Sequence, residues 1–275
     1  MKGKALTPHS VRKFQETVYK NYHDTPRHLP WRKTRNPYRI LVSEIMLQQT
    51  QVERVLEKYR TFIKSFPDFA SLAKAPLHEI LKVWQGMGYN RRAIALKRIA
   101  EIITKEFRGK LPSSENDLVK LPGIGKYSAA AILAFAFGRP TVFIETNIRR
   151  VFIHLFFQDR EDVKDSEIFP LVEKTIDHNH PREWYYALMD YGVMLKKEFE
   201  NPNRRSAHYK MQTPFQGSNR QIRGMILKLL LKKPDISECE ILHTLRSDPE
   251  KIRENLATLQ KDGFIWRKGK RLRIA

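Results

Sequence analysis

Two glycines in the segment 121–128 (Leu-Pro-Gly-Ile-Gly-Lys-Tyr-Ser) have a spacing that indicates a site for an anion. Gly123 and Gly125 permit a tight turn and a close approach by another backbone, because neither has a Cβ atom. The turn leads into a predicted helix, whose free N–H groups and dipole favour negative charge. We therefore expect Gly123, Gly125, Lys126 and Ser128 to bind phosphate, although a lone Gly-x-Gly is usually an ordinary connection between helices.

The carboxyl of Glu44 falls on an otherwise apolar stripe of a predicted helix, together with Ile40 and Leu47. A carboxyl flanked by apolar groups is desolvated, which favours its protonated form and suits it to donate a proton. Taken singly, a helical glutamate more often faces solvent or pairs with a neighbouring charge. The neighbouring motifs must decide between the two roles.

Helical periodicity dominates the chain up to Phe199, and strand-like alternation is absent from this region. The longest apolar stretch, 129–137, is too short to span a bilayer. No apolar segment follows the first four residues, so we expect no secretory signal and a cytoplasmic, nucleoid-associated protein. We predict helices over residues 36–47, 50–66, 77–84, 90–107, 114–120, 126–137, 148–157, 169–179 and 181–199.

The composition changes after Phe199. Residues 201–206 are predicted to be a loop and 213–218 a linker. Ser237 and Glu240 form a capping-box pattern at the second of three short predicted helices. Residues 264–267 and 271–274, with Lys-Gly between them, then indicate a β-hairpin. This order is typical of a winged-helix module, so we expect a small α/β winged-helix-like domain at 219–275.

The charge of the chain points to a polyanionic partner. Lys and Arg number 51 and Asp and Glu 30, a formal net charge of +21. Residues 196–275 hold 19 of these basic residues against 9 acidic ones. Nucleic acid is the usual partner of such an excess, and a solvated basic surface is the alternative. The single cysteine, Cys239, excludes an intramolecular disulfide and any metal site built on several thiolates.

Seven segments resemble the endonuclease III and MutY superfamily of helix-hairpin-helix (HhH-GPD) DNA glycosylases. The resemblance implies an all-α two-lobed domain at 1–212, with a six-helix barrel lobe at about 30–138. The second lobe would then come from about 7–29 and 139–212. Ser-Glu-Ile-Met-Leu-Gln-Gln-Thr at 43–50 is the segment most specific to the adenine-excising branch. The segments are 29–32, 36–38, 43–50, 86–89, 121–128, 147–151 and 187–192.

The resemblance implies roles for four residues in breaking an N-glycosidic bond, a task that suits two carboxyls. Glu44 would protonate the adenine. Glu145 stands where the family has an aspartate that supports the cationic sugar, and its carboxyl is one methylene further from the backbone. Asn147 would contact the water and this carboxylate. Tyr127 replaces the Schiff-base lysine of bifunctional members, so excision without efficient strand cleavage is expected.

Excision also requires that the base leave the stack, at a cost of a few kcal/mol. In the resemblance, Tyr89 is the aromatic wedge, and Gln48 and Gln49 fill the gap and form hydrogen bonds. Trp31 and Arg32 would line the adenine pocket. The alternative is that these residues have no role in DNA binding. Tyr89 would then be an ordinary surface residue, the two glutamines would cap helices, and Trp31 would belong to the core.

The sequence departs from the family in two places. Residues 196–205 contain none of the four cysteines of the usual iron–sulfur cluster, so we expect no cofactor; the resemblance still admits a monovalent cation at the hairpin. The family also usually has a C-terminal Nudix-like domain that recognises 8-oxoguanine, and we expect the winged-helix candidate in its place.

Three functions therefore remain open. The leading hypothesis is a monomeric glycosylase without membrane association, acting on double-stranded DNA that contains a mismatched or damaged base. It would remove adenine opposite guanine or 8-oxoguanine. Thymine, uracil or hypoxanthine excision is the alternative enzyme activity. A non-catalytic DNA-binding protein on the same scaffold, or a regulator acting through the winged helix, is the alternative of another class.

Overall fold

The computed structural model describes residues 6–211 and 213–275, and contacts between these residues divide them into two units. The first unit comprises residues 6–40, 113–120 and 124–211. The second comprises residues 41–112, 121–123 and 213–275. Gln212, the predicted end of the first domain, and residues 1–5 lie outside the described residues, so the predicted domain boundaries stay a prediction.

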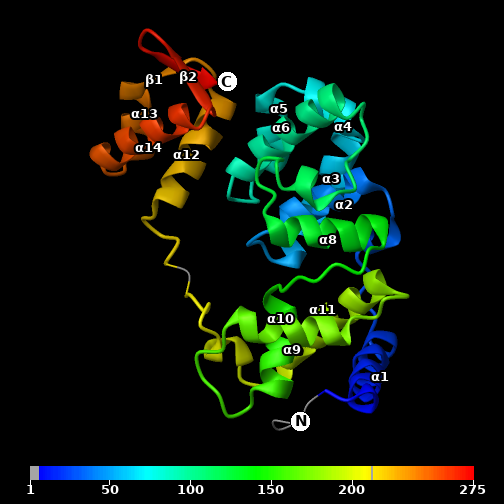
Figure 1. Cartoon of the computed structure of the whole chain (residues 1–275). Helices are drawn as coiled ribbons and strands as arrows, with labels where there is room; N and C mark the ends of the chain where they lie inside the picture. The colour runs from blue at the N-terminus through cyan, green and yellow to red at the C-terminus, as the bar shows by residue number, and fades with distance from the viewer. Residues whose placement is uncertain (1–5, 212) are drawn as a thin grey trace. The chain divides into compact units, whose positions relative to one another are not determined.

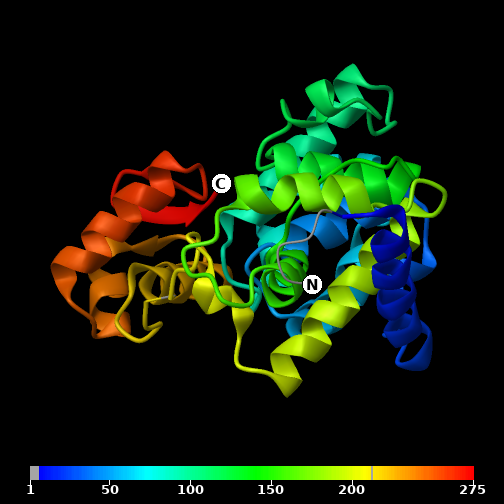
Figure 2. The same cartoon turned by 60° about the horizontal axis from the view of Figure 1, so that its bottom comes forward.

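The first unit is built almost wholly of helices, and α11 packs against both α1 and α9 (Figures 1 and 2). Thr7 begins α1 by accepting a hydrogen bond from the Ser10 N–H, with Pro8 at the first helical position. Gly138, in the left-handed conformation, ends α8. The elements are α1 (Pro8–Asp24), η1 (Pro30–Lys33), the start of α2 (Pro37–Leu47), α7 (Glu115–Leu118), α8 (Lys126–Phe137), α9 (Thr146–Phe156), α10 (Asp165–Thr175), α11 (Pro181–Glu198) and η2 (Pro202–Arg205).

Aromatic side chains hold the core of this unit together. Phe14 of α1 meets Phe152 and Phe156 of α9 and Trp184 of α11 edge-on, with ring centroids 5.6–5.7 Å apart. Edge-to-face pairs at this separation add to the stabilisation from buried apolar area. The packing fixes α9, whose first turn carries the residues described below as the candidate site.

The second unit begins with the remainder of α2 and continues through α3 (Val52–Ser65), α4 (Phe69–Lys74), α5 (Leu77–Trp84) and α6 (Arg91–Glu106). Asp68 starts α4 by accepting a hydrogen bond from the Ser71 N–H at 2.8 Å. Phe62 and Trp84 are fully buried and meet edge-on at 5.9 Å. This core positions the short turn between α5 and α6.

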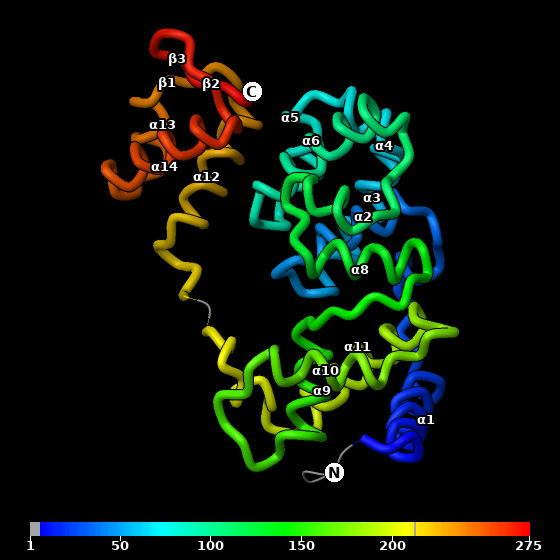
Figure 3. Tube along the Cα trace, viewed as in Figure 1, coloured from blue at the N-terminus to red at the C-terminus, as the bar shows by residue number. Residues whose placement is uncertain are grey.

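The second unit also includes the C-terminal module, residues 219–275. It contains α12 (Asn219–Lys232), β1 (Ile236–Ser237), α13 (Glu238–Leu245), α14 (Pro249–Lys261), β2 (Ile265–Lys268) and β3 (Arg271–Ile274). The strands form an antiparallel sheet in the order β1-β3-β2, visible at the C-terminal end of the trace in Figure 3. The predicted capping box is confirmed, with Ser237 and Glu240 exchanging hydrogen bonds at the start of α13. Cys239, also on α13, is exposed.

The structure corrects several details of the predicted elements. The helix predicted at 169–179 begins four residues earlier and ends at Thr175, so Pro170 lies within it. The Glu167 carboxylate fixes its start by accepting from the Lys164 N–H, and Asp177 turns the chain beyond its end by accepting from the Asn179 N–H. The helix α1 and the short elements η1, α4 and β1 were not predicted, and residues 202–205, predicted to be loop, form η2.

Among the described residues, no helix combines the length and the apolar character needed to cross a membrane.

Candidate functional site

The predicted hairpin connects α7 to α8. Leu121 and Ile124 are buried and anchor it, whereas Gly125 is exposed at the position that precedes α8. Gly123 has φ +80°, and a Cβ atom there would lie 3.3 Å from the Cβ of Ala95, so both conformation and space favour glycine. In the described part of the chain, no side chain caps the start of α8. The N–H groups of this helix start are therefore suited to an anion.

The two predicted hairpin side chains differ in their surroundings. Lys126 is exposed at the first position of α8, and Ser128 is buried two residues later. Tyr127 lies between them, with 37% of its surface exposed and its ring edge-on to Phe143 at 5.6 Å. The side chain of Lys126, the uncapped start of α8 and the phenol of Tyr127 are therefore all exposed on the same surface.

Glu145 is the residue immediately before α9, and its carboxylate caps that helix. One carboxylate oxygen accepts from the backbone N–H groups of Asn147 at 2.7 Å and Ile148 at 3.0 Å. The other accepts from the side-chain amide of Asn147 at 3.2 Å. Burial raises the pKa of Glu145, and these three hydrogen bonds oppose that shift by favouring the ionised form. The result is an oriented, partly desolvated carboxyl at the positive end of a helix.

Asn147 connects Glu145 to a buried arginine. The guanidinium of Arg150 donates from Nη1 to the Asn147 side-chain oxygen and to the Gly192 carbonyl, both at 2.7 Å. Its Nε donates to Asn201 at 3.2 Å. Burial lowers the pKa of Arg150, while the nearby charge of Glu145 opposes the shift. Sequence reasoning identified Glu145 and Asn147 and missed Arg150, whose signal was a cation three residues after Asn147 on the same helix face.

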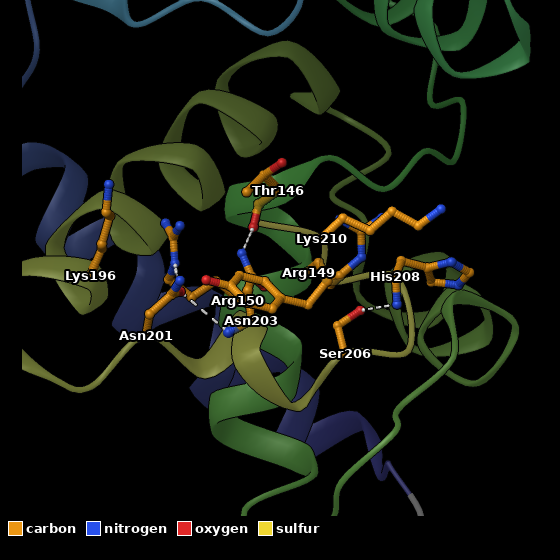
Figure 4. Close-up of a pocket in the computed structure, with 10 residues that line it drawn as sticks. Thr146, Arg149, Arg150, Lys196, Asn201, Asn203, Ser206, His208 and Lys210 are labelled. Atoms are coloured by element: carbon orange, nitrogen blue, oxygen red, sulfur yellow. Dashed lines mark hydrogen bonds between the residues drawn. The ribbon is translucent and has the colours of Figure 1, made fainter. Parts of the chain in front are cut away.

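Arg150 also lines a pocket of about 300 Å³, which is shown in Figure 4. Asn203, which is buried, donates to the Thr146 carbonyl at 2.9 Å and thereby ties η2 to the first turn of α9. The residues that line the pocket are mostly polar or basic: Thr146, Arg149, Arg150, Lys196, Asn201, Asn203, Ser206, His208, Tyr209 and Lys210.

The resemblance described above would place an iron–sulfur cluster near residues 196–205, several of which line this pocket. Amide, hydroxyl and cationic side chains line it, and residues 196–205 provide no thiolate. Iron–sulfur clusters are held by cysteine thiolates, so this donor set does not fit one. Within the described residues, no group of three or more His, Cys, Asp or Glu side chains is placed to hold a metal ion.

Glu44 lies on α2 and is buried, with 8% of its surface exposed. Ile40, one turn earlier on this helix, is also buried, and Leu47 is half-buried. These surroundings have the apolar character that the sequence indicated. Glu44 belongs to the second unit, whereas Glu145, Asn147 and Tyr127 belong to the first.

Arg92, a buried residue of α6, joins the two loops that contain the predicted DNA-contacting side chains. Its guanidinium donates to the Met46 carbonyl at 2.7 Å and to the Gln48 carbonyl, both at the end of α2. It also donates to Gly88 O at 3.2 Å and, through Nε, to Tyr89 O at 3.4 Å. Sequence reasoning missed Arg92; the signal was a charge in a helix turn rich in apolar residues.

The backbone in these loops is strained at two predicted site residues. Gln49 has φ +53° and Tyr89 has φ +46°, values that side-chain-bearing residues seldom adopt. Gln49 is exposed, and Gln48 donates from its amide to the Gly123 carbonyl at 3.3 Å. Gln48 is thereby brought to the hairpin, and Arg92 brings the Gln48 backbone to that of Tyr89.

Trp31 and Arg32 lie on η1 and are held within the first unit. Trp31 is buried. Arg32 forms two hydrogen bonds with the buried Asp190 carboxylate, at 2.6 and 2.7 Å, and its guanidinium lies 4.6 Å from the ring centre of Tyr186. Arg27 adds a further bond to Asp190 at 3.2 Å. The roles of Trp31 and Arg32 in a base pocket stay predictions, because this geometry also serves packing.

Comparisons with known proteins agree on one group. A family model described as "HhH-GPD superfamily base excision DNA repair protein" matches residues 42–174. An adenine DNA glycosylase of Buchnera aphidicola subsp. Baizongia pistaciae is 39% identical over 187 residues, covering 66% of this chain and 52% of that protein. A thymine/uracil-DNA glycosylase of Methanothermobacter thermautotrophicus is 30% identical over 185 residues, covering 66% and 84%.

A solved thermostable thymine-DNA glycosylase has a similar structure. Its TM-score is 0.61 at 27% sequence identity, over 70% of this chain and 90% of that one. The chain spans about half the length of the adenine DNA glycosylases that it matches first.

Proposed function

Because this chain belongs to the HhH-GPD superfamily of base excision DNA repair proteins, we propose that it is a DNA glycosylase that removes a mispaired adenine opposite guanine or 8-oxoguanine. The observation that carries the proposal is the Glu145 carboxylate, held at the start of α9 by Asn147 and two backbone N–H groups. The 39% identity to the Buchnera adenine DNA glycosylase supports adenine as the base.

On this proposal, DNA first binds through its phosphates. The N–H groups at the start of α8, which no side chain caps in the described part of the chain, and the side chain of Lys126 attract a backbone phosphate. The flipped adenine leaves a gap in the duplex, which Tyr89 enters as a wedge while Gln48 and Gln49 provide hydrogen bonds. The tie from Arg92 to the backbones of Gln48 and Tyr89 supports a joint role for the two loops.

The chemical step is then a hydrolysis supported by two carboxyls. Glu44, buried on α2, donates its proton to the adenine, which leaves with the electron pair of the N-glycosidic bond. The ionised Glu145 carboxylate stabilises the positive charge that develops on the sugar, and Asn147 orients it. Water adds its hydroxyl to the sugar carbon, and its proton passes to Glu145. Tyr127 cannot form an imine, so the DNA strand stays intact.

We further propose that the C-terminal module is a winged helix that binds DNA. Its hairpin carries five cations between residues 267 and 273, and the Arg273 guanidinium lies 3.6 Å from the ring centre of Trp266 on the paired strand. Such a basic and aromatic surface suits phosphate and base contacts. The protein would then act on DNA as a monomer, in the cytoplasm at the nucleoid and without an iron–sulfur cluster.

A second candidate activity is the excision of thymine or uracil from mismatches with guanine. The chain covers 84% of the Methanothermobacter thymine/uracil-DNA glycosylase, against 52% of the Buchnera adenine enzyme. The similar solved structure is also a thymine-DNA glycosylase. Hypoxanthine is a further base for the same test.

Excision from a panel of duplexes tests both activities. The duplexes contain A opposite 8-oxoguanine, A:G, T:G, U:G or hypoxanthine, and each reaction is assayed with and without alkali to separate base release from strand cleavage. We expect adenine release, with cleavage only after alkali. Release of thymine or uracil without adenine would favour the second candidate.

Two variants test whether the protein is an enzyme at all. Glu44→Gln and Glu145→Gln should each lower single-turnover excision by about a hundredfold or more, while duplex binding is retained. Duplex binding without release of any base, by wild-type protein and both variants alike, would contradict a glycosylase. It would leave a DNA-binding protein on the glycosylase scaffold.

A further inference from the structure

The C-terminal module contacts the turn that carries Tyr89, and both belong to the second unit. Arg91, next to that turn, donates from Nε and Nη2 to the two oxygens of Asp262 at 2.8 and 3.1 Å. Asp262 directly follows α14, and at the adjoining Gly263 a Cβ atom would lie 3.5 Å from the guanidinium of Arg98. The end of α14 therefore rests against the start of α6.

A second contact reaches Tyr89 itself. Arg220, in the first turn of α12, donates from Nη1 to the Tyr89 hydroxyl at 3.2 Å. Its Nη2 donates to the Thr213 carbonyl at 2.7 Å, which fixes the other side of the guanidinium. Arg92 holds the Tyr89 backbone through its carbonyl. Tyr89 is thus held at two points: Arg220 of the module contacts its hydroxyl, and Arg92 of α6 contacts its backbone carbonyl.

We propose that Arg220 is a positioning residue for Tyr89, and that the C-terminal module presets this side chain for insertion into the duplex. This inference rests on the proposed function, which gives Tyr89 its role as the wedge. A side chain that is ordered before binding loses less conformational entropy when it inserts. Arg220 also places a positive charge beside the wedge, which attracts phosphate instead of blocking DNA.

The Arg91–Asp262 pair is one of the contacts that dock the module. Arg91 is 67% exposed and Asp262 19%, so the pair is screened by salt and is individually weak. Exchange of the two charges in the double variant Arg91→Asp/Asp262→Arg should restore the docking that either single variant loses. Failure of the double variant to recover would overturn the role of the pair.

A double-mutant cycle tests the positioning role. Arg220→Ala and Tyr89→Phe should each lower the single-turnover excision rate about three- to tenfold, the range for one hydrogen bond. The double variant should fall no further, because both changes remove the same contact. Arg220→Lys should recover part of the rate, and 2-aminopurine fluorescence beside the mismatch should report less base extrusion in Arg220→Ala.

Arg223→Ala is the matched control, because it removes the same charge from the same helix. Among the described residues, the Arg223 Nε donates a hydrogen bond to the Asn219 carbonyl of its own helix. It should retain the wild-type rate. An equal loss in Arg223→Ala, additive losses in the cycle, or faster excision in Arg220→Ala would each overturn the proposal, the last by indicating an inhibitory contact.

Hydrogen–deuterium exchange of the free protein separates this inference from the proposed function. Amide exchange across residues 85–90 should be faster in Arg220→Ala than in wild type and unchanged in Arg223→Ala. If exchange is faster in Arg220→Ala but the wild-type protein releases no base, the proposed glycosylase function is contradicted and the contact is supported. If exchange is unchanged in Arg220→Ala and the wild-type protein releases a base, only the proposed contact is contradicted.

Discussion

Gly192 of α11 lies so close to Asn147 of α9 that a Cβ atom at position 192 would lie 2.7 Å from the Asn147 Cβ and still nearer to its carbonyl oxygen. Real Cβ atoms do not approach other atoms so closely, and here the neighbour is backbone. The Gly192 carbonyl also accepts from Arg150, which in turn holds the Asn147 side chain. The position of the Glu145 carboxylate therefore depends on the absence of a side chain at Gly192.

Alanine substitutions at Gly192 and at a second helical glycine should distinguish the effect of close packing on stability from the effect of helix propensity. Gly192→Ala must push α11 away from α9, and we expect a loss of about 1–3 kcal/mol in the free energy of unfolding. Gly224→Ala, in α12, is the matched change because its Cβ would meet open space. It should stabilise the protein by about 0.5–1 kcal/mol, as alanine does in a helix. Urea denaturation measures both, and a Gly192→Ala protein as stable as wild type would contradict the packing argument.

Replacement of Glu145 by glutamine should raise stability while lowering excision by about a hundredfold or more. Burial raises the pKa of Glu145, so its ionisation costs more free energy in the folded state than in the unfolded state. Wild-type stability should therefore decline, relative to Glu145→Gln, as the pH rises from the ordinary carboxyl range through the raised pKa. At neutral pH the variant should melt at the higher temperature. Below the ordinary carboxyl pKa, the two melting temperatures should converge.

Glu167 provides a comparison with Glu145, because its pKa is shifted in the opposite direction. A hydrogen bond from the Lys164 N–H, followed by one from Arg160, lowers the pKa of Glu167. Glu167→Gln should therefore destabilise the protein at neutral pH, and this loss should disappear as the pH falls through the lowered pKa. Parallel pH profiles for the two glutamine variants would show that the environment of Glu145 has been misjudged.

Arg92→Lys should be far from conservative. Burial lowers the pKa of Arg92 to about 10, so the guanidinium remains charged at neutral pH. Lysine keeps the charge but cannot reach carbonyls on both loops at once. We expect a loss of about 3 kcal/mol from the buried carbonyls left unpaired. Arg54→Lys, on the exposed face of α3, should change the unfolding free energy by less than about 0.5 kcal/mol.

Tyr127→Lys should give the protein strand-cleaving chemistry that wild type lacks. The side chain at this position is exposed at the second residue of α8, where the helix dipole lowers the pKa of an amine and increases its nucleophilicity. Borohydride should trap the variant covalently on DNA after excision. Tyr127→Phe serves as the control, and trapping of wild-type protein would point instead to the neighbouring Lys126.

Local signals in the sequence predicted much of the fold. The resemblance of seven segments predicted a helix-hairpin-helix DNA glycosylase, and the comparisons confirm that family. Capping chemistry predicted the start of α13, and apolar periodicity predicted most helices to within a few residues. The start of α10 was predicted four residues too late, because the start is fixed by the side chain of Glu167, which accepts a hydrogen bond from the Lys164 N–H.

The site was less accessible to sequence reasoning, because its connections span long stretches of chain. Arg92 reaches carbonyls more than 40 residues away, and Arg150 reaches Gly192 across 42. The function of Glu145 as a helix cap was also missed, since Ser, Thr, Asp and Asn are the residues that usually begin a helix. Only the folded chain brings these partners together.

The one cysteine of the chain has a practical consequence. Cys239 is exposed on α13, in the same module whose α12 and α14 contact the turn that carries Tyr89. A maleimide dye or nitroxide spin label would therefore attach at a single known position without any engineered residue. The natural protein thus provides its own spectroscopic reporter for whether the module stays docked or swings away when a duplex binds.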